Sequence, residues 1–247
     1  MSVIDLHCHL LPGLDDGPTS MPEALAMARV AAASGTTTIV ATPHIDHRWG
    51  VRPADLPRRG AALADALQEE GVELELHTSG EIAIPRLADL SSDELDGLRL
   101  GDGRYLLLEC PLSPADADFD VLLLKVQERG QPIVLAHPER CPLFQREPER
   151  LARCVQAGML CSITAGSLRG GFGERVRRFS LEILSEGLVH DLASDAHDDH
   201  SRTPSLVGAL EQAEDELPGV SARAEWLTSV APAAILAGER PPPPPPL

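Results

Sequence analysis

The stretch VIDLHCHLLPGLDDG, residues 3–17, carries two histidines at the end of the first apolar run of the chain. Successive side chains of a β-strand point to opposite faces, so His7 and His9 are expected on one face and Cys8 on the other. Two neighbouring imidazoles on one face form either a stacked structural pair or half of a metal site. The residues at the ends of the other predicted strands distinguish these two interpretations.

Apolar, β-branched runs of strand length recur along the whole chain and alternate with amphipathic helical patterns. The six further runs are residues 36–41, 72–76, 105–109, 132–136, 159–164 and 188–194. The helical patterns begin after a capping-box sequence, Ser20 to Glu23, and recur at about residues 54–70, 118–129, 147–157, 174–186 and 205–214. Strand–helix alternation requires crossover connections and parallel pairing, so we predict an α/β fold. Seven units fit either a doubly wound sheet or a closed barrel.

The domain organisation is simple. No long linker divides the 247 residues, and we therefore predict one domain over residues 1–240. Residues 241–247, PPPPPPL, can form only an extended polyproline segment and are expected to be a disordered, unpacked tail. Residues 84–100 show no regular pattern and carry no prediction.

Composition limits the classes of partner. The chain is 43% hydrophobic and 24% charged, as in folded globular proteins, and no apolar stretch is long enough for membrane insertion. The net charge of −17 excludes nucleic acid and anionic membrane surfaces as partners. The five cysteines are scattered without a C-x-x-C pair, and the N-terminus lacks a signal-peptide pattern, so we predict a cytoplasmic protein with reduced thiols. The oligomeric state stays open.

Metal-ligating side chains follow six of the seven predicted strands, and only the sixth strand ends in hydroxyls. In a parallel α/β barrel the C-terminal ends of all strands open on one face, so these side chains are expected to converge there. A lone histidine in a strand is usually a packed core residue, and a lone glutamate after a strand is often a helix cap. For all these residues to be structural, such an explanation would have to hold separately at each of six strand ends, which argues against it. The residues concerned are His7, His9, Asp16, His44, Glu81, Glu109, His137, Asp195 and His197.

Four carboxylates and five imidazoles in one place would repel one another without cations. Mixed imidazole and carboxylate ligands suit Mn, Fe or Zn rather than Ca, and nine ligands are too many for one ion. The sequence therefore predicts a multinuclear site of divalent metal ions. Three such ions would more than neutralise the carboxylates and leave positive charge for a phosphate dianion. Asp15 ranks below Asp16 as a ligand, because a role in shaping the turn before Gly17 would be enough to explain its presence.

The motifs DLHCHLLPGLDDGP, ATPH, SGEI, LLLE, LAHPER, ITAGSL and ASDAH, in this order, resemble those of the PHP (polymerase and histidinol phosphatase) superfamily. Within it the chain is similar to the metal-dependent protein-tyrosine phosphatases of capsular and exopolysaccharide loci, the CpsB/YwqE type. The similarity extends from Val3 to about Glu239. It implies a PHP-type (β/α)7 distorted TIM-like barrel with three metal ions, most commonly Mn²⁺, at the C-terminal ends of the strands.

The resemblance also implies roles for individual residues. The implied ligand groups are His7, His9, Glu81 and Asp195 around one ion, Glu81, Glu109 and His137 around a second, and Asp16, His44 and His197 around the third. Arg140 and Arg202 match the phosphate-binding arginines of the family, and His200 is a candidate proton donor. Cys141 and Asp198 depart from the family pattern, which has an aromatic residue and an asparagine there.

The resulting hypothesis is hydrolysis of a phosphate monoester by metal-bound hydroxide. The implied substrate and partner is a phosphotyrosine-bearing bacterial tyrosine autokinase that controls polysaccharide export. One alternative is a histidinol-phosphate phosphatase or another small-molecule PHP phosphoesterase. A second alternative, from outside the enzymes, is a structural metal-binding PHP module. No cysteine begins a C-x5-R loop, which excludes a phosphatase with a cysteine nucleophile.

Overall fold

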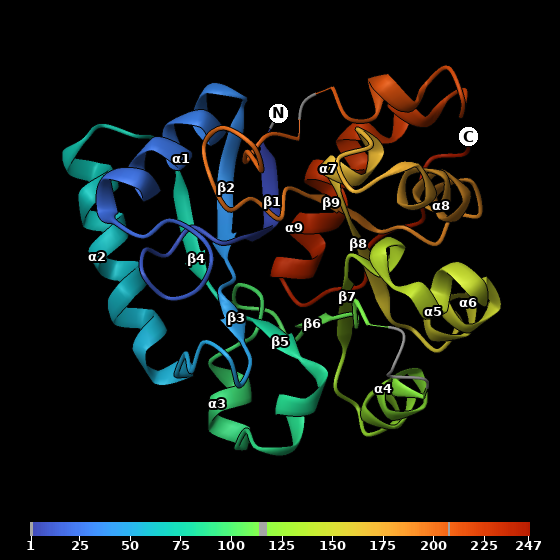
Figure 1. Cartoon of the computed structure of the whole chain (residues 1–247), viewed down its shortest axis with the longest axis horizontal. Coiled ribbons are helices and arrows are strands. Elements are labelled where there is room, and N and C mark those ends of the chain that lie inside the picture. The colour runs from blue at the N-terminus through green and yellow to red at the C-terminus, as the bar shows by residue number, and fades with distance from the viewer. Residues whose placement is uncertain (1, 114–117, 207) are drawn as a thin grey trace.

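The strands of the computed structural model, which describes residues 2–113, 118–206 and 208–247, form a distorted parallel barrel with helices on its outside (Figure 1). Within these residues the hydrogen-bonded orders are β1-β2-β4 and β3-β5-β6-β7-β8-β9, and every strand pair is parallel. The strands are β1 Val3–Cys8, β2 Thr36–Ala41, β3 His44–Ile45, β4 Glu75–Thr78, β5 Glu81–Ala83, β6 Leu106–Glu109, β7 Ile133–Ala136, β8 Leu160–Thr164 and β9 Asp191–Ala193. The predicted α/β fold with parallel strands is confirmed.

Two of the seven predicted strands are interrupted. β3 continues the line of β2 after Thr42 and Pro43, and β5 continues β4 after a two-residue break. The ladder persists across both breaks, because Thr42 N donates to Cys8 O at 2.9 Å and Glu81 N donates to Pro43 O at 3.1 Å. Pro43 has no N–H and cannot donate to the ladder, which explains the interruption between β2 and β3. Each break bends the chain just before a candidate ligand, His44 or Glu81.

The barrel closes between β1 and the residues after β9. His9 N donates to Ala196 O at 2.9 Å, and Asp195 N donates to His7 O at 2.8 Å. A buried apolar cluster fills the barrel interior, where Ile4 of β1 meets Leu107 of β6. Residues of strands that are not neighbours can meet only inside a closed barrel, so closure is favoured over a doubly wound sheet.

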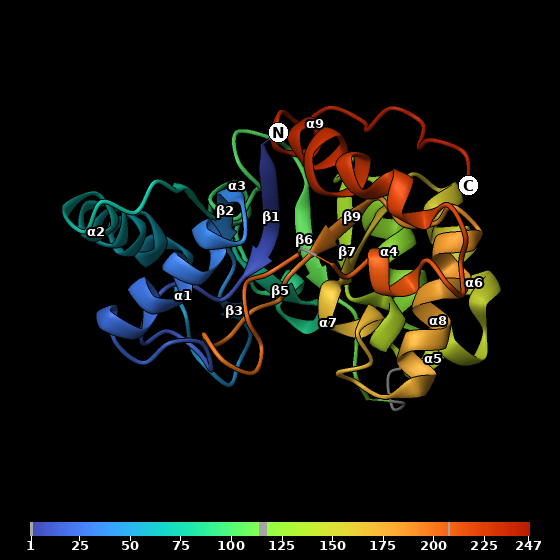
Figure 2. The same cartoon turned by 90° about the horizontal axis from the view of Figure 1, so that it is seen from above.

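The helices cover the outer faces of the strands, as Figure 2 shows from above. They are α1 Met21–Ala33, α2 Leu56–Glu69, α3 Ser92–Asp96, α4 Phe119–Glu128, α5 Pro142–Arg146, α6 Pro148–Gln156, α7 Ala165–Leu168, α8 Glu174–Ser185 and α9 Ala231–Leu236. The structure places a helix at five of the predicted positions, and the prediction of a helix over residues 205–214 is wrong. Gly208 takes φ +77° there, which a right-handed helix excludes, and only a 3-10 turn, Glu211–Ala213, follows. Residue 207 lies outside the described residues.

The expected capping box at the start of α1 does not form. The Ser20 side chain makes no capping hydrogen bond, and the Glu23 carboxylate instead accepts from Thr19 N at 2.7 Å. A true capping box lies at the start of α3, where Ser91 and Glu94 cap each other. It lies in the segment that carried no prediction. None of the described helices is long and apolar enough to cross a bilayer.

The proline-rich tail is held against the body of the protein. Trp226 Nε1 donates to Pro242 O at 3.1 Å, and Arg223 Nε donates to Pro245 O at 2.8 Å. Figure 2 shows the tail beside α9, on the side of the barrel where β1 begins. This differs from the expected disordered tail, because a polyproline segment leaves its carbonyls free and two buried donors of the body use them.

Candidate metal centre

All nine predicted ligands lie at the C-terminal ends of the strands, and each belongs to at least one compact group of possible metal ligands. Within each group the ligand atoms lie within 4.8 Å of one another. The groups among the described residues are His9, Asp16, His44 and His197; His7, His9 and Asp195; His7, Glu81 and His137; and His44, Glu81 and Glu109. The ligand groups that the family resemblance implies do not include His9 with Asp16 or His44 with Glu109, and the structure adds both of these neighbours.

The two histidines of the opening motif point at the same spot. Their Nε2 atoms are 3.3 Å apart, and Glu81 Oε2 lies 3.4 Å from each of them. Two ligands about 2.1 Å from one metal ion lie about 3.4 Å apart in tetrahedral geometry, so these spacings match a shared ion. Glu81 Oε2 is fully buried, and His44 Nδ1 lies 3.0 Å from it as well. A buried carboxylate oxygen surrounded by three imidazole nitrogens fits a divalent cation.

The electrostatics of the two glutamates show the repulsion that the sequence predicted. Burial by itself would raise the pKa of Glu81, but His7 and His137 hold it well below its usual range. His137 Nε2 is 2.6 Å from Glu81 Oε1. Burial and the charge of Glu81 together raise the pKa of Glu109. A cation between the two carboxylates would stabilise both as anions.

Asp15 has a larger role than shaping the turn. Its Oδ2 lies 2.7 Å from His9 Nδ1 and accepts from His44 N at 2.9 Å. Burial lowers the pKa of His9, but the hydrogen bonds of Asp15 and Glu81 outweigh it and raise the pKa to about 10. Because Asp15 occupies Nδ1, it directs Nε2 toward the ligand groups. Gly17 allows this turn, since a Cβ there would lie 2.4 Å from His9 O.

Asp16 lies at the more exposed edge of the centre. Its Oδ1 is 3.4 Å from His44 Nε2 and 3.3 Å from His197 Nε2. The hydrogen bond of His197 holds the pKa of Asp16 below its usual range against the effect of burial. Two imidazoles therefore flank one carboxylate oxygen, which again is a possible ligand set.

Two candidate ligands occupy the left-handed region of the backbone. They are His137, with φ 37°, and Asp195, with φ 50°, and no other non-glycine residue among those described has a positive φ. Such a conformation is uncommon outside glycine, and it is enriched at functional sites. His137 directly follows β7 and Asp195 lies two residues after the end of β9, where a turn of the backbone aims each side chain into the barrel mouth.

The two candidate phosphate-binding arginines reach the centre. Arg140 and Arg202 line a cavity of about 210 Å³ together with Asp16, His44 and Glu109. His200 lies outside this cavity. Its side chain is 78% exposed, and its Nδ1 is 3.0 Å from Asp199 Oδ1. The structure therefore brings the two arginines together with the predicted ligands and leaves His200 on the surface.

Two supporting residues escaped prediction. Asp198 organises the loop that carries Arg202, because its Oδ1 accepts from His200 N at 2.8 Å and from Arg202 N at 3.1 Å. Glu139 is fully buried and accepts from Thr164 N at 2.9 Å and from Ser167 Oγ at 2.6 Å. The hydroxyls after the sixth strand thus fix the neighbouring loop. An aspartate beside a ligand histidine is the signal that could have identified Asp198 as a loop-forming residue.

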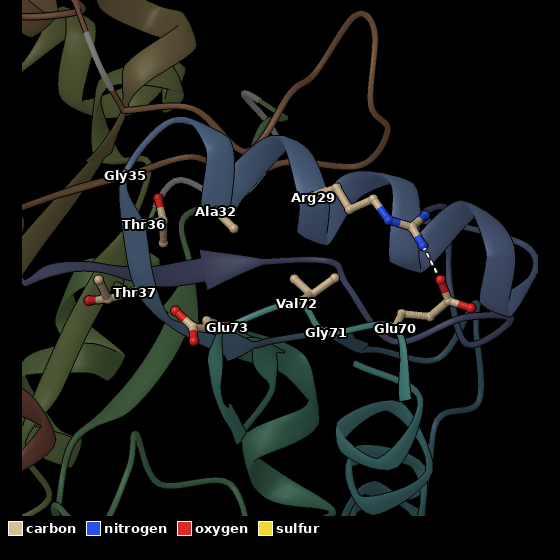
Figure 3. Close-up of a pocket in the computed structure, with 9 residues that line it drawn as sticks. All are labelled: Arg29, Ala32, Gly35, Thr36, Thr37, Glu70, Gly71, Val72 and Glu73. Atoms are coloured by element: carbon tan, nitrogen blue, oxygen red, sulfur yellow. Dashed lines mark hydrogen bonds and ion pairs between the residues drawn. The ribbon is translucent and has the colours of Figure 1, made fainter. Parts of the chain in front are cut away.

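A larger cavity, about 570 Å³, lies at the other ends of the strands (Figure 3). Thr36 at the start of β2 lines it, and an ion pair between Arg29 and Glu70 borders it. None of the nine candidate ligands is among its lining residues. Active sites of parallel barrels form at the C-terminal ends of the strands, so this cavity is not the candidate centre.

Comparison with known proteins finds relatives that match most of the chain. The family model described as "Capsular polysaccharide synthesis, CpsB/CapC" matches residues 3–233. The chain is 35% identical over 217 residues to the tyrosine-protein phosphatase YwqE of Bacillus subtilis, which covers 87% of this chain and 85% of the relative. It is 32% identical over 198 residues to a putative tyrosine-protein phosphatase CapC of Staphylococcus aureus, which covers 79% and 77% of the two chains.

Solved structures give the same result for the fold. The chain resembles crystal structures of YwqE from Bacillus subtilis and CpsB from Streptococcus pneumoniae, described as unique metal-dependent tyrosine phosphatases, with a TM-score of 0.82, 33% identity and coverage of 99% of both chains. A β-aspartyl dipeptidase from Fervidobacterium islandicum matches with a TM-score of 0.62 at 14% identity, over 95% of this chain and 72% of that one. At this low identity the likeness extends to the fold alone.

Proposed function

Because this chain belongs to the CpsB/CapC family of capsular polysaccharide synthesis proteins, we propose that it is a metal-dependent protein-tyrosine phosphatase. The substrate we propose is a phosphotyrosine-bearing bacterial tyrosine autokinase in the regulation of capsular or exopolysaccharide synthesis. One observation carries the proposal: nine imidazole and carboxylate ligands and two arginines meet at the mouth of the barrel. The five cysteines are free and buried, which supports the expected cytoplasmic location.

The residues of the centre suit three divalent metal ions, for which we propose Mn²⁺, with Fe or Zn as the alternatives. The nine predicted ligands would hold them. Glu81 is the bridging candidate because it is the carboxylate that belongs to two of the groups and it offers two ligand oxygens. When bound, the ions would activate water as the nucleophile and act as Lewis acids toward the phosphate. Metal binding needs neutral imidazoles, so His9, whose pKa is about 10 without metal, would release its proton on loading.

The two arginines would bind the phosphate. Guanidinium groups bind phosphate oxygens through charge-assisted, often bidentate hydrogen bonds. Arg140 and Arg202 approach the cavity from two different loops, so they can contact the phosphate from two directions. A tyrosine leaving group has a pKa of about 10, so its departure needs no strong general acid. The exposed His200, which turns toward Asp199, is therefore assigned no required step.

The direct test compares substrates on the metal-loaded enzyme. The protein is depleted of metal with a chelator, reloaded with Mn²⁺, Fe²⁺ or Zn²⁺, and assayed on a phosphotyrosine peptide and on histidinol phosphate. We expect activity only after reloading and a large preference for the phosphotyrosine peptide in kcat/KM. A preference for histidinol phosphate would overturn the proposed substrate. No hydrolysis of any phosphate ester by the reloaded protein would favour a structural metal-binding module.

A further inference from the structure

Phe172 contacts both candidate phosphate-binding arginines. The guanidinium carbon of Arg140 lies 4.2 Å from the centroid of the Phe172 ring, and that of Arg202 lies 5.8 Å from it. Both distances fall within the range of cation–π attraction. Phe172 lies in the loop between α7 and α8, and Arg140 and Arg202 lie in the loops after β7 and β9. One aromatic ring therefore joins three loops at the mouth of the barrel.

The loop is built to hold this ring. Gly166 has no side chain, and a Cβ there would lie 3.3 Å from Phe172 Cε2. Gly173, directly after Phe172, has φ +92°, a backbone conformation that favours glycine. The ring thus lies close to bare backbone on one side and to the arginines on the other, and the loop that carries it is shaped by glycines.

Phe172 is not a member of the hydrophobic core. The other three phenylalanines of the chain, Phe119, Phe144 and Phe179, are buried in the main core cluster. Phe172 is half-buried and lines a second cavity of about 260 Å³ beside Arg202. Its partly open position, next to two cations, indicates a role at the site.

The two guanidinium groups need such a partner. Both carry positive charge, and both donate to Asp195 Oδ2 at 2.7 Å. Arg202 Nη2 also donates to Asp195 O at 3.0 Å. These bonds hold one edge of each guanidinium group, and the guanidinium planes set the direction of the remaining N–H groups. The electron-rich face of an aromatic ring attracts cations without occupying their hydrogen-bond donors. Those donors stay available for a phosphate.

From these contacts we propose that Phe172 is a positioning residue, whose ring orients Arg140 and Arg202 for the phosphate group of the substrate. This inference rests on the proposed phosphatase function. It assigns Phe172 to phosphate binding and not to the metal ions, because the ring faces the two arginines and is not among the candidate metal ligands. Loss of the ring should therefore weaken phosphate binding and leave metal content unchanged.

The test uses two substitutions, one that removes the aromatic ring and one that keeps it. Phe172→Leu keeps an apolar side chain and removes the aromatic face, whereas Phe172→Tyr keeps the ring. Binding of inorganic phosphate to the Mn²⁺-loaded protein is measured by calorimetry, and KM and kcat are measured on an aryl phosphate. For Phe172→Leu we expect Kd and KM to rise about 3- to 30-fold, the range of one or two cation–π contacts, with kcat changed less. Phe172→Tyr should stay within about 3-fold of the wild type.

A double-mutant cycle separates positioning from folding. In the Arg140→Ala background the Phe172→Leu change should cost less than it does in the wild type, because one contact is already gone. Equal losses for the leucine and tyrosine variants, additive losses in the cycle, or unchanged phosphate affinity in Phe172→Leu would each overturn the proposal. Failure of the wild-type protein to hydrolyse any aryl phosphate would instead count against the proposed function, since the phosphate Kd values test Phe172 without turnover.

Discussion

Arg140 Nη1 lies 2.7 Å from Asp195 Oδ2, and this contact links the candidate phosphate site to the candidate metal site. The other oxygen, Asp195 Oδ1, lies 3.5 Å from the Nε2 atoms of both His7 and His9. One carboxylate therefore faces the metal ligands with one oxygen and the arginines with the other. Arg202 Nη2 donates to the same Oδ2 at 2.7 Å, so the two arginines share one anchor.

The first prediction concerns the arginines. Arg140→Ala and Arg202→Ala should each lower kcat/KM on a phosphotyrosine peptide about 100- to 1,000-fold, as removal of one charge-stabilising donor does in other enzymes. The metal content, measured by elemental analysis, should stay the same. Arg99→Ala is the matched control, because Arg99 pairs with Asp96 on the surface. A large loss of bound metal in either variant would contradict the assignment of these arginines to phosphate.

The second prediction concerns Asp15. Asp15→Asn removes the charge that holds His9 Nδ1, and loss of such a partner lowers metal affinity about 10- to 100-fold. Competition with a chromophoric chelator measures this affinity. Asp46→Asn is the matched control, because Asp46 also caps a loop near the centre and accepts from Trp49 N at 2.8 Å. Equal metal affinities of the Asp15 and Asp46 variants would show that Asp15 only shapes its turn.

Much of this centre follows from local patterns in the sequence. Strand alternation predicts that His7 and His9 share a face, and their Nε2 atoms are indeed 3.3 Å apart. Parallel strands deliver their ends to one face, so residues as distant as Glu81 and Asp195 could be placed near the same histidine. Their carboxylate oxygens lie 3.4 Å and 3.5 Å from His7 Nε2. These inferences need only the period of the strand and the direction of the chain.

Other features depend on contacts that no local pattern encodes. Phe172 follows a glycine-rich turn, and its partner Arg140 is more than thirty residues away, so only the folded chain shows that they meet. The predicted helix at 205–214 is absent for a different reason. Gly208 takes a positive φ there, and an amphipathic pattern does not reveal backbone angles. The position of the tail, like that of Phe172, depends on contacts between distant residues. Its carbonyls accept hydrogen bonds from Trp226 and Arg223, which precede it by about twenty residues.

The third prediction concerns this tail. Deletion of residues 241–247 leaves the indole N–H of Trp226 and the Nε of Arg223 without their acceptors, and both side chains are buried. We expect the free energy of unfolding to fall by about 1–3 kcal/mol for each unsatisfied group, measured by urea denaturation. kcat/KM should not change, because the tail lies on the side of the barrel where β1 begins. An unchanged unfolding midpoint would support the disordered tail that the proline run predicts.

The fourth prediction concerns His190, whose stability effect depends on pH. Burial, helped by the nearby charge of Arg240, lowers the pKa of His190 to about 4 against the opposing effect of a hydrogen bond with the backbone of Leu188. His190 Nδ1 accepts from Cys161 N at 3.2 Å, which requires a neutral ring nitrogen. The unfolded chain binds this proton at its ordinary pKa of about 6.5, so between pH 6.5 and 4 the unfolded state holds more protons. Stability therefore falls as the pH is lowered through that range.

His190→Gln removes this titration and keeps an acceptor near Cys161 N. Between pH 7 and pH 4 the wild type should lose about 1–3 kcal/mol more unfolding free energy than the variant does, with both kept at the same metal load. His47→Gln is the matched control, because the His47 side chain is exposed. Urea denaturation at four pH values measures the difference. If the His190 variant lost stability toward acid as steeply as the wild type, the imidazole would be protonated inside the fold, and the hydrogen bond from Cys161 could not exist below neutral pH.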